Sequence, residues 1–259
     1  MSRIAVAVAA AVALAGCGSG QTSTTPASGS GTPKVTGDIT VFAAASLTET
    51  FTQLGKDFEA ANPGAKVKFN FAGSSALAQQ LNQGAPADVF ASAAPANMKQ
   101  VTDTKTITDT PTTFVKNKLA IVVPKGNPGK ISGLPDFAFA DKKIALCAEQ
   151  VPCGAAAKKV FEVAKVKPAP DTLEQDVKAV LTKVSLGEVD GALVYKTDVK
   201  AAGDKVEGID FAEADQAVND YPIAPVAKAP NAAAAKAFVE FVLSAKGKAV
   251  LSAAGFVSP

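Results

Sequence analysis

From residue 38 onward, the sequence alternates between β-type runs and stretches with helical spacing. The first run, ITVFAAA, is β-branched and aromatic before it ends in three alanines. The next stretch places four apolar side chains on one face of a helix: Leu47, Phe51, Leu54 and Phe58. β-type runs return at KVKFNFAG, ADVFASA, KLAIVVPKG, KKIALCAEQ, GALVYKT and YPIAPVA, mostly with helical patterns between them. This alternation predicts an α/β fold, with helices covering largely parallel sheets.

The region from residue 38 to 259 is large for a single core and suits two lobes. Pro124 and Pro222 lie near the points where the chain is expected to pass between them. We therefore predict that lobe I contains residues 38–117 plus 221–259, and that lobe II contains residues 118–220.

The first 17 residues have the pattern of an export signal. Arg3 precedes an apolar run that ends in LAGC at Cys17 and is too short for an ordinary transmembrane helix. This ending resembles the lipobox of bacterial lipoproteins, in which Cys17 would carry the lipid; a plain secretory signal is the alternative. We predict a signal peptide over 1–16 and a Gly/Ser/Thr/Pro-rich tether over 17–37, which holds the protein at the outer face of the cell membrane.

The composition argues against several classes of function. Without Arg3, the 26 basic residues become 25, all lysine, against 24 acidic residues, and histidine is absent. A nearly balanced charge without a long basic run argues against a nucleic-acid partner. The lack of histidine excludes Ser-His-Asp and Cys-His catalysis and the commonest zinc ligand. Because no arginine remains after Arg3, a bound dianion must be held by neutral donors, helix ends or lysine rather than by a guanidinium group.

Two junctions place serine between a predicted strand and a predicted helix. Ser46 opens SLTE, which fits a capping box with Glu49, so it either only caps the helix or also faces a ligand. FNFAGSSALAQQL repeats the arrangement at Ser74 and Ser75. Such junctions meet at the carboxyl edge of a parallel sheet, where helix starts attract anions. They predict an anion site; a hydrolase using Ser46 or Ser74 is the alternative from another class.

Cys147 and Cys153 remain as a pair if Cys17 carries a lipid. In an exported chain, this pair predicts a small-loop disulfide. A redox-active pair in a thiol-disulfide protein is the alternative, although the spacing is not C-x-x-C.

Eight segments together are similar to one family of proteins. They are ITVFAAASLTETF, FNFAGSSALAQQL, GAPADVFASA, VPCGAAAKKVF, QDVKAVL, GALVYKTD, YPIAPV and the closing GF. In this order, over nearly all of residues 38–259, they resemble the periplasmic molybdate-binding proteins of ABC-type molybdate importers. The resemblance implies a two-lobed periplasmic binding protein fold of type II, which captures molybdate, and also tungstate, in the cleft between its lobes. It further implies delivery to permease subunits, no enzymatic activity, no cofactor and a monomeric chain.

The resemblance also implies a set of neutral ligand donors, with molybdenum bound only as its oxyanion. In that family the donors are two serines, two backbone amides and a tyrosine hydroxyl. Matched motif by motif, they are Ser46, Ser74, Cys153, Val177 and Tyr195. Gly73 stands where the family often has a third serine, so Ser75 competes with Ser74 for the second position. Cys153 stands where alanine is usual, and its contact would be the backbone amide.

Two further alternatives concern the ligand itself. The size of the cleft is not visible in a sequence, so sulfate or another tetrahedral anion is the alternative within the binding class. A purely structural surface lipoprotein would bind no small ion at all.

Overall fold

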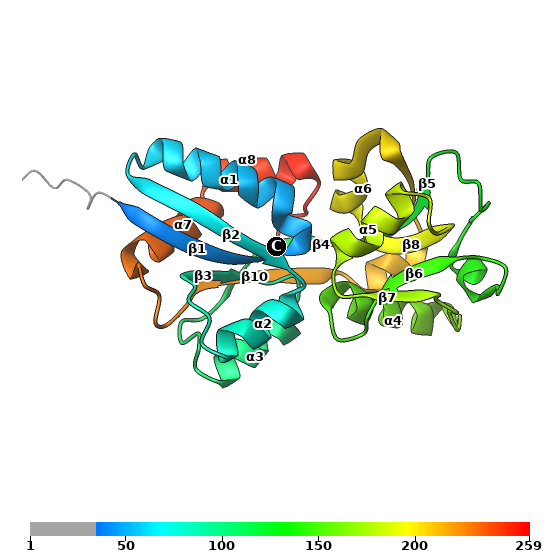
Figure 1. Ribbon diagram of the computed structural model, residues 1–259, viewed down its shortest axis with the longest axis horizontal. Helices are drawn as coiled ribbons and strands as arrows, with labels where there is room; N and C mark the ends of the chain where they lie inside the picture. Colours follow the sequence, from blue (N-terminus) through cyan, green and yellow to red (C-terminus); the bar gives the residue numbers. More distant parts are fainter. Residues whose placement is uncertain (1–34) are drawn as a thin grey trace, which may run out of the picture. The chain divides into compact units, whose positions relative to one another are not determined.

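The computed structural model describes residues 35–259, which form two five-stranded sheets covered by helices (Figure 1). The first sheet has the order β2-β1-β3-β10-β4, and the second has the order β7-β6-β8-β5-β9. We call the half built on the first sheet lobe I and the half built on the second sheet lobe II. In each sheet four of the five strands run in the same direction, and only β10 and β5 oppose their neighbours. The predicted α/β fold with two lobes of mostly parallel strands is therefore confirmed.

The chain first forms β1 to β4 in lobe I, then forms β5 to β9 in lobe II, and returns to lobe I for β10. Lobe I contains β1 Gly37–Ala44, the 3₁₀ turn η1 Ala45–Leu47, α1 Thr48–Ala61, β2 Ala65–Ala72, α2 Ser74–Asn82, β3 Val89–Ala91, α3 Pro95–Asp103, β4 Thr112–Asn117, β10 Asn219–Pro225, α7 Ala232–Leu243 and α8 Ala245–Ala254. Lobe II contains β5 Leu119–Pro124, η2 Leu134–Ala138, β6 Ile144–Cys147, α4 Pro152–Ala164, β7 Thr172–Glu174, α5 Val177–Ser185, β8 Gly191–Tyr195, α6 Lys196–Ala202, η3 Gly203–Lys205, β9 Val206–Ile209 and η4 Ala212–Gln216.

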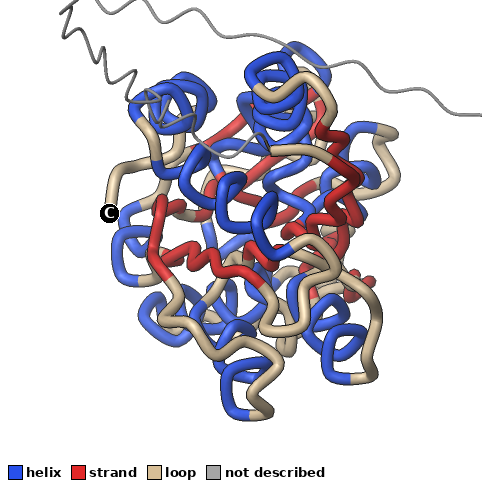
Figure 2. The backbone as a smooth tube through the Cα atoms, turned by 90° about the vertical axis from the view of Figure 1, so that its left-hand side faces the viewer, coloured by secondary structure: helices blue, strands red, loops and turns tan. Residues whose placement is uncertain are grey.

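Helices enclose the sheet of lobe I on both faces, so its strands lie inside (Figure 2). The predicted apolar stripe of α1 is buried against one face, where the ring of Phe51 lies 5.8 Å from that of Phe114 and 6.1 Å from that of Phe238. On the other face, α2 and α3 cover a smaller cluster that includes Leu77 and Phe90. Burial of this stripe supplies the apolar driving force that holds α1 in place.

The core of lobe II is mainly aliphatic and draws on all of its central strands. Its buried members include Ile121, Ile144 and Leu193, with Phe137 and Phe161 in contact at 5.5 Å between ring centroids. Ala45 of lobe I also belongs to this cluster. The small side chain that follows β1 therefore lets lobe II pack directly against the backbone of lobe I.

The chain passes between the lobes twice, once after β4 and once before β10, and both passages carry a buried asparagine. Asn117 donates to the Thr197 hydroxyl at 2.8 Å, and Asn219 donates to the Tyr195 hydroxyl at 3.0 Å. Strand β10 begins at Asn219, close to Pro222, near which the sequence predicted the second passage between the lobes. The lobe boundaries themselves stay a prediction.

The structure differs from the sequence-based expectation in several elements. The closing helix is interrupted at Ser244, whose hydroxyl accepts from the Gly247 amide and caps α8 as a separate helix. Strands β4, β7 and β9 and helix α6 were not predicted. The three missed strands mix polar with apolar residues and are only partly buried, so they lack the continuous apolar run that marks β5 and β8.

Some predictions fall on residues that the structure does not describe. The signal peptide over 1–16, the lipid attachment at Cys17 and nearly all of the tether lie outside residues 35–259. Within residues 35–259, no helix combines the length and the apolar character needed to cross a membrane.

Candidate functional site

One small pocket between the lobes gathers all five predicted donors. Its wall includes Ser46, Ser74, Cys153, Val177 and Tyr195. Its free volume is about 10 Å³, close to the room that one water molecule needs, whereas pockets for drug-sized ligands measure hundreds of cubic ångströms. The pocket therefore suits only a very small ligand.

The walls of the pocket are built from the ends of strands and the beginnings of helices. In lobe I, β1 and β2 are parallel neighbours whose last register pair is Ala44 with Ala72, so the serines that follow them lie at one sheet edge. In lobe II, Cys153 lies in the first turn of α4 and Val177 is the first residue of α5. The first amides of a helix have no acceptor inside the helix and carry its positive dipole end. Both lobes therefore present neutral donors suited to an anion.

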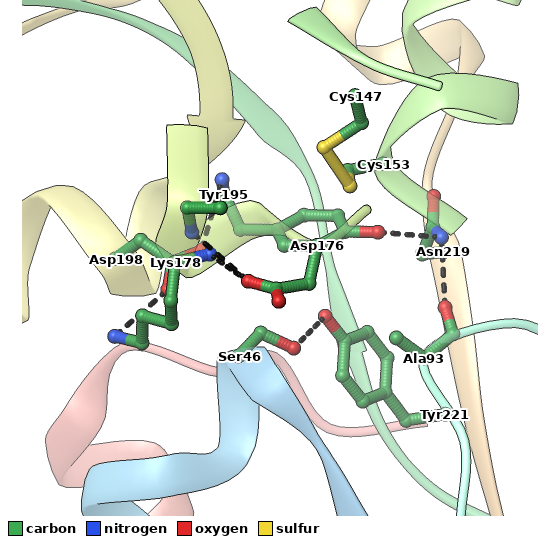
Figure 3. The surroundings of a disulfide bond; sticks show 11 residues. Ser46, Ala93, Cys147, Cys153, Asp176, Lys178, Tyr195, Asp198, Asn219 and Tyr221 are labelled. Carbon is green, nitrogen blue, oxygen red and sulfur yellow. Dashed lines mark hydrogen bonds and ion pairs between the residues drawn. A yellow bond between two sulfur atoms is a disulfide. The ribbon is translucent and has the colours of Figure 1, made fainter. Parts of the chain in front are cut away.

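Ser46 does not cap α1, so the capping-box prediction is wrong. The turn η1 comes between β1 and the helix, which begins only at Thr48 without a side-chain cap. The Ser46 hydroxyl instead pairs with the Tyr221 hydroxyl at 2.9 Å (Figure 3). Glu49, the expected partner in the capping box, reaches Lys178 of lobe II. Ser46 is thus buried at the pocket and held by a side chain of β10.

Ser74, rather than Ser75, lies on the pocket wall. The Ser74 hydroxyl accepts from the Ala93 amide at 3.0 Å, which leaves its own hydrogen available for an acceptor inside the pocket. Ser75 is the next residue of α2 and is also buried, but it is not part of the pocket wall. Of the two competing positions, the geometry therefore favours Ser74.

Asn219 orients Tyr195, the last residue of β8. Its side-chain amide donates both to the Tyr195 hydroxyl at 3.0 Å and to the Ala93 carbonyl at 2.7 Å (Figure 3). Because the Tyr195 oxygen accepts from Asn219, its own hydrogen can point elsewhere. Burial raises the pKa of Tyr195 well above its ordinary value, so the group is a neutral donor.

Sequence reasoning missed Asn219 and Tyr221, the two side chains of β10 that hold the predicted donors. The only signal in the sequence was that the chain has two tyrosines, of which Tyr221 begins the YPIAPVA run. Burial raises the pKa of Tyr221 above its ordinary value, so its hydroxyl also stays neutral. The contact between Tyr221 and Ser46 joins residues 175 positions apart, and only the tertiary structure shows it.

A disulfide supports the wall that α4 contributes. Cys147 at the end of β6 is joined to Cys153 in the first turn of α4 (Figure 3). The next residue is Gly154, where a Cβ would lie 2.7 Å from the Cys147 carbonyl oxygen and would overlap the Ala148 carbonyl oxygen. The glycine lets the helix start lie against this turn, and the disulfide fixes the segment that carries the Cys153 amide.

One charged side chain lies on the pocket wall, and three others, on α1, α5 and α6, contact one another. Asp176 lies on the pocket wall, and its carboxylate accepts from the Lys178 and Ala179 amides at 2.8 and 2.9 Å. The Lys178 ammonium lies 2.8 Å from Glu49 and 3.1 Å from Asp198, the latter outside hydrogen-bond angles. Burial raises the pKa of Asp198 to about 6, although Lys178 acts against this shift. Burial opposes the charge of Lys178, but the two carboxylates outweigh it and raise its pKa.

The chemistry of the wall suits binding rather than bond breaking. The Ser46 hydroxyl is paired with a tyrosine and the Ser74 hydroxyl with a backbone amide, and neither contact supplies a general base. Within residues 35–259, no three Asp, Glu or Cys side chains are grouped in a way that could hold a metal cation. Hydroxyl and amide donors from two lobes can together hold a small anion.

Comparisons with known proteins agree on one family. A family model for bacterial extracellular solute-binding proteins matches residues 39–257. The molybdate-binding protein ModA of Mycobacterium tuberculosis is 41% identical over 230 residues, which cover 89% of this chain and 88% of that protein. ModA of Escherichia coli is 34% identical over 239 residues, with coverage of 85% and 89%. The periplasmic molybdate-binding protein of Azotobacter vinelandii shares the fold, with a TM-score of 0.72, 21% identity and coverage of 85% and 99%. The chain therefore belongs to the family of bacterial extracellular solute-binding proteins.

Proposed function

We propose that this protein captures molybdate, and also tungstate, outside the cytoplasm and delivers it to the permease of an ABC transporter. One observation carries the proposal: the two lobes bring two serines, a tyrosine and the first residues of two helices to the wall of one small pocket. The names of the relatives in Mycobacterium tuberculosis and Escherichia coli support the choice of ligand.

Neutral donors are sufficient to hold such a dianion. Each hydrogen bond to a charged group contributes about 1.5–3 kcal/mol, and several in a dry pocket reach micromolar affinity or better after the cost of association. Sulfate has the same charge and tetrahedral shape but shorter bonds, so donors spaced for the larger ion would bind it less well. Pocket size is thus the proposed basis of selectivity.

The contacts of the serines and the burial of the cysteines favour a binding protein over the two enzymatic alternatives. A hydrolase would need a base beside Ser46 or Ser74, and the contacts of these serines are a tyrosine and an amide. A thiol-disulfide protein would need an accessible pair, whereas Cys147 and Cys153 are both buried. We further propose that the protein acts as a monomer, without a cofactor, anchored to the outer face of the membrane through a lipid on Cys17.

The test compares four oxyanions on the purified protein. A ligand that binds only the folded state raises the melting temperature with the logarithm of its concentration. We expect molybdate and tungstate to raise it, and sulfate and phosphate to raise it less. The variant Ser46→Ala should lose about tenfold or more in molybdate affinity, measured by calorimetry, because it removes a donor to a charged oxygen. A wild-type protein that responds to sulfate more than to molybdate would refute the choice of ligand.

A further inference from the structure

Gly73 lies where lobe I meets lobe II. It immediately precedes α2, and its backbone angles are φ −58° and ψ 134°. These angles are accessible to any amino acid, since only positive φ values favour glycine. The conformation of the chain therefore does not require glycine at this position.

The neighbouring lobe, in contrast, leaves no room for a side chain. A Cβ on Gly73 would overlap the carbonyl oxygen of Gln175 and lie 3.4 Å from its carbonyl carbon. It would also lie 3.5 Å from Cγ1 of Val151. Both neighbours belong to lobe II, and the closer one is a backbone carbonyl, which cannot rotate away as the end of a side chain can. The glycine is thus needed only because lobe II comes so close.

The segments in contact are the ones that carry the pocket donors. Gly73 is followed by Ser74, whose hydroxyl lies on the pocket wall. On the other side, Gln175 is two residues before Val177, the first residue of α5. A displacement that separates Gly73 from Gln175 therefore also separates a donor of lobe I from a donor of lobe II.

We propose that Gly73 is the positioning residue that sets how closely the two lobes of this chain approach over the anion: its missing side chain allows the Gln175 carbonyl to come into contact, whereas a side chain here, such as the serine that the resembling family often has, needs a wider spacing at this contact. This inference rests on the proposed function, because it concerns closure over the bound oxyanion. Gly73 acts through the spacing of the donors and need not touch the anion itself. Interfaces packed this tightly do not absorb an extra methyl group without movement.

The matched control is a glycine whose Cβ would be tolerated. Gly133 has an extended φ of −176°, and a Cβ there would meet only Cδ of Pro135, at an ordinary 3.5 Å. Gly73→Ala and Gly133→Ala make the same chemical change, so they share the effect of alanine on the unfolded chain. Only Gly73→Ala places the new methyl group between the lobes.

The experiment measures molybdate affinity by calorimetry for the wild type, Gly73→Ala, Gly73→Ser and Gly133→Ala. We expect Gly73→Ala to bind about tenfold or more weakly, Gly73→Ser to bind more weakly still, and Gly133→Ala to match the wild type. The melting temperature of Gly73→Ala without ligand should stay close to that of the wild type, because separation of the lobes relieves the overlap. Small-angle scattering of the molybdate-saturated proteins should give a larger radius of gyration for Gly73→Ala than for the wild type.

Two results would overturn the inference about Gly73. One is an unchanged affinity in Gly73→Ala, and the other is a loss of stability without ligand, which would place the need for glycine inside lobe I. The wild-type protein tests the proposed ligand separately. If the wild type binds another of the four oxyanions instead of molybdate, the ligand assignment fails and the same variants are compared with that anion. If it binds none of them, the proposed function fails, and this inference fails with it.

Discussion

The Lys178 ammonium of lobe II lies 2.8 Å from the Glu49 carboxylate of lobe I and 3.1 Å from the Asp198 carboxylate of its own lobe. The side chain of Glu49 is 53% exposed, whereas that of Asp198 is fully buried. One lysine therefore joins the two lobes through an exposed contact and neutralises a buried carboxylate within lobe II. The second contact carries more energy, because a buried charge that loses its partner has no water to replace it.

We expect Lys178→Met to lower the free energy of unfolding by about 3 kcal/mol or more, because Asp198 is then buried without its partner and must either stay charged or take up a proton. Glu49→Gln should lower it by less than about 1 kcal/mol, since the contact is exposed and screened by solvent. Urea unfolding of the ligand-free protein measures both changes. As a control, Asp198→Asn in the Lys178→Met background should recover much of the loss. Equal losses in the two single variants would show that the buried contact stabilises the protein no more than the exposed contact does.

Asp198 should give stability a particular dependence on pH. Burial raises the pKa of Asp198 to about 6 from its ordinary value of 3.8. The folded protein therefore binds this proton more tightly than the unfolded chain, so its contribution is most favourable at low pH and is lost as the pH rises through about 6. Asp198→Asn removes the titration. Relative to this variant, the wild type should lose up to about 3 kcal/mol of unfolding free energy between about pH 4 and pH 7.

The measurement is urea unfolding of both proteins at a series of pH values. Other groups titrate equally in the wild type and in Asp198→Asn, so the difference between the two curves isolates one carboxyl group. A difference that stays constant over this range would mean that Asp198 has an ordinary pKa in the folded protein.

Ser74 and Ser75 provide a matched pair for the second serine position. Ser74→Ala should weaken molybdate binding by about tenfold or more, because it removes a donor to a charged oxygen. Ser75→Ala makes the same change one residue further along the buried start of α2, off the pocket wall, and should leave affinity unchanged. Calorimetry on both variants decides the assignment. A larger effect from Ser75→Ala would place the second donor there.

The disulfide should matter more for stability than for binding. Replacing Cys147 and Cys153 together by serine should lower the free energy of unfolding by about 2 kcal/mol, the loop-closure contribution of so short a loop. Molybdate affinity should fall less than in Ser74→Ala, because the proposed contact of Cys153 is its backbone amide. Urea unfolding and calorimetry of the double variant, and of the wild type with and without a reducing agent, measure the two effects. Unchanged stability after reduction would contradict this account.

Much of the architecture was predictable because it is encoded in local patterns. The apolar stripe of α1 and the β-branched runs of β1 and β5 repeat with the periods of a helix and of buried strands, and these elements were predicted correctly. The interruption at Ser244 was not predicted, because the apolar pattern continues across it and only the observed cap reveals a second helix. Strands β4, β7 and β9 were not predicted because they are only partly buried and carry no continuous apolar run.

The sequence by itself determined that serines follow two neighbouring strands, and that a chain without histidine, and without arginine after Arg3, must hold an anion with other donors. Only the tertiary structure decided what holds those donors. In the fold, the Ser46 hydroxyl pairs with the Tyr221 hydroxyl instead of capping α1, and Gly73 lies against the Gln175 carbonyl. The physical reason is range: strand and helix patterns act over a few residues, whereas both of these contacts join segments more than 100 positions apart, which only the packing of the folded chain brings together.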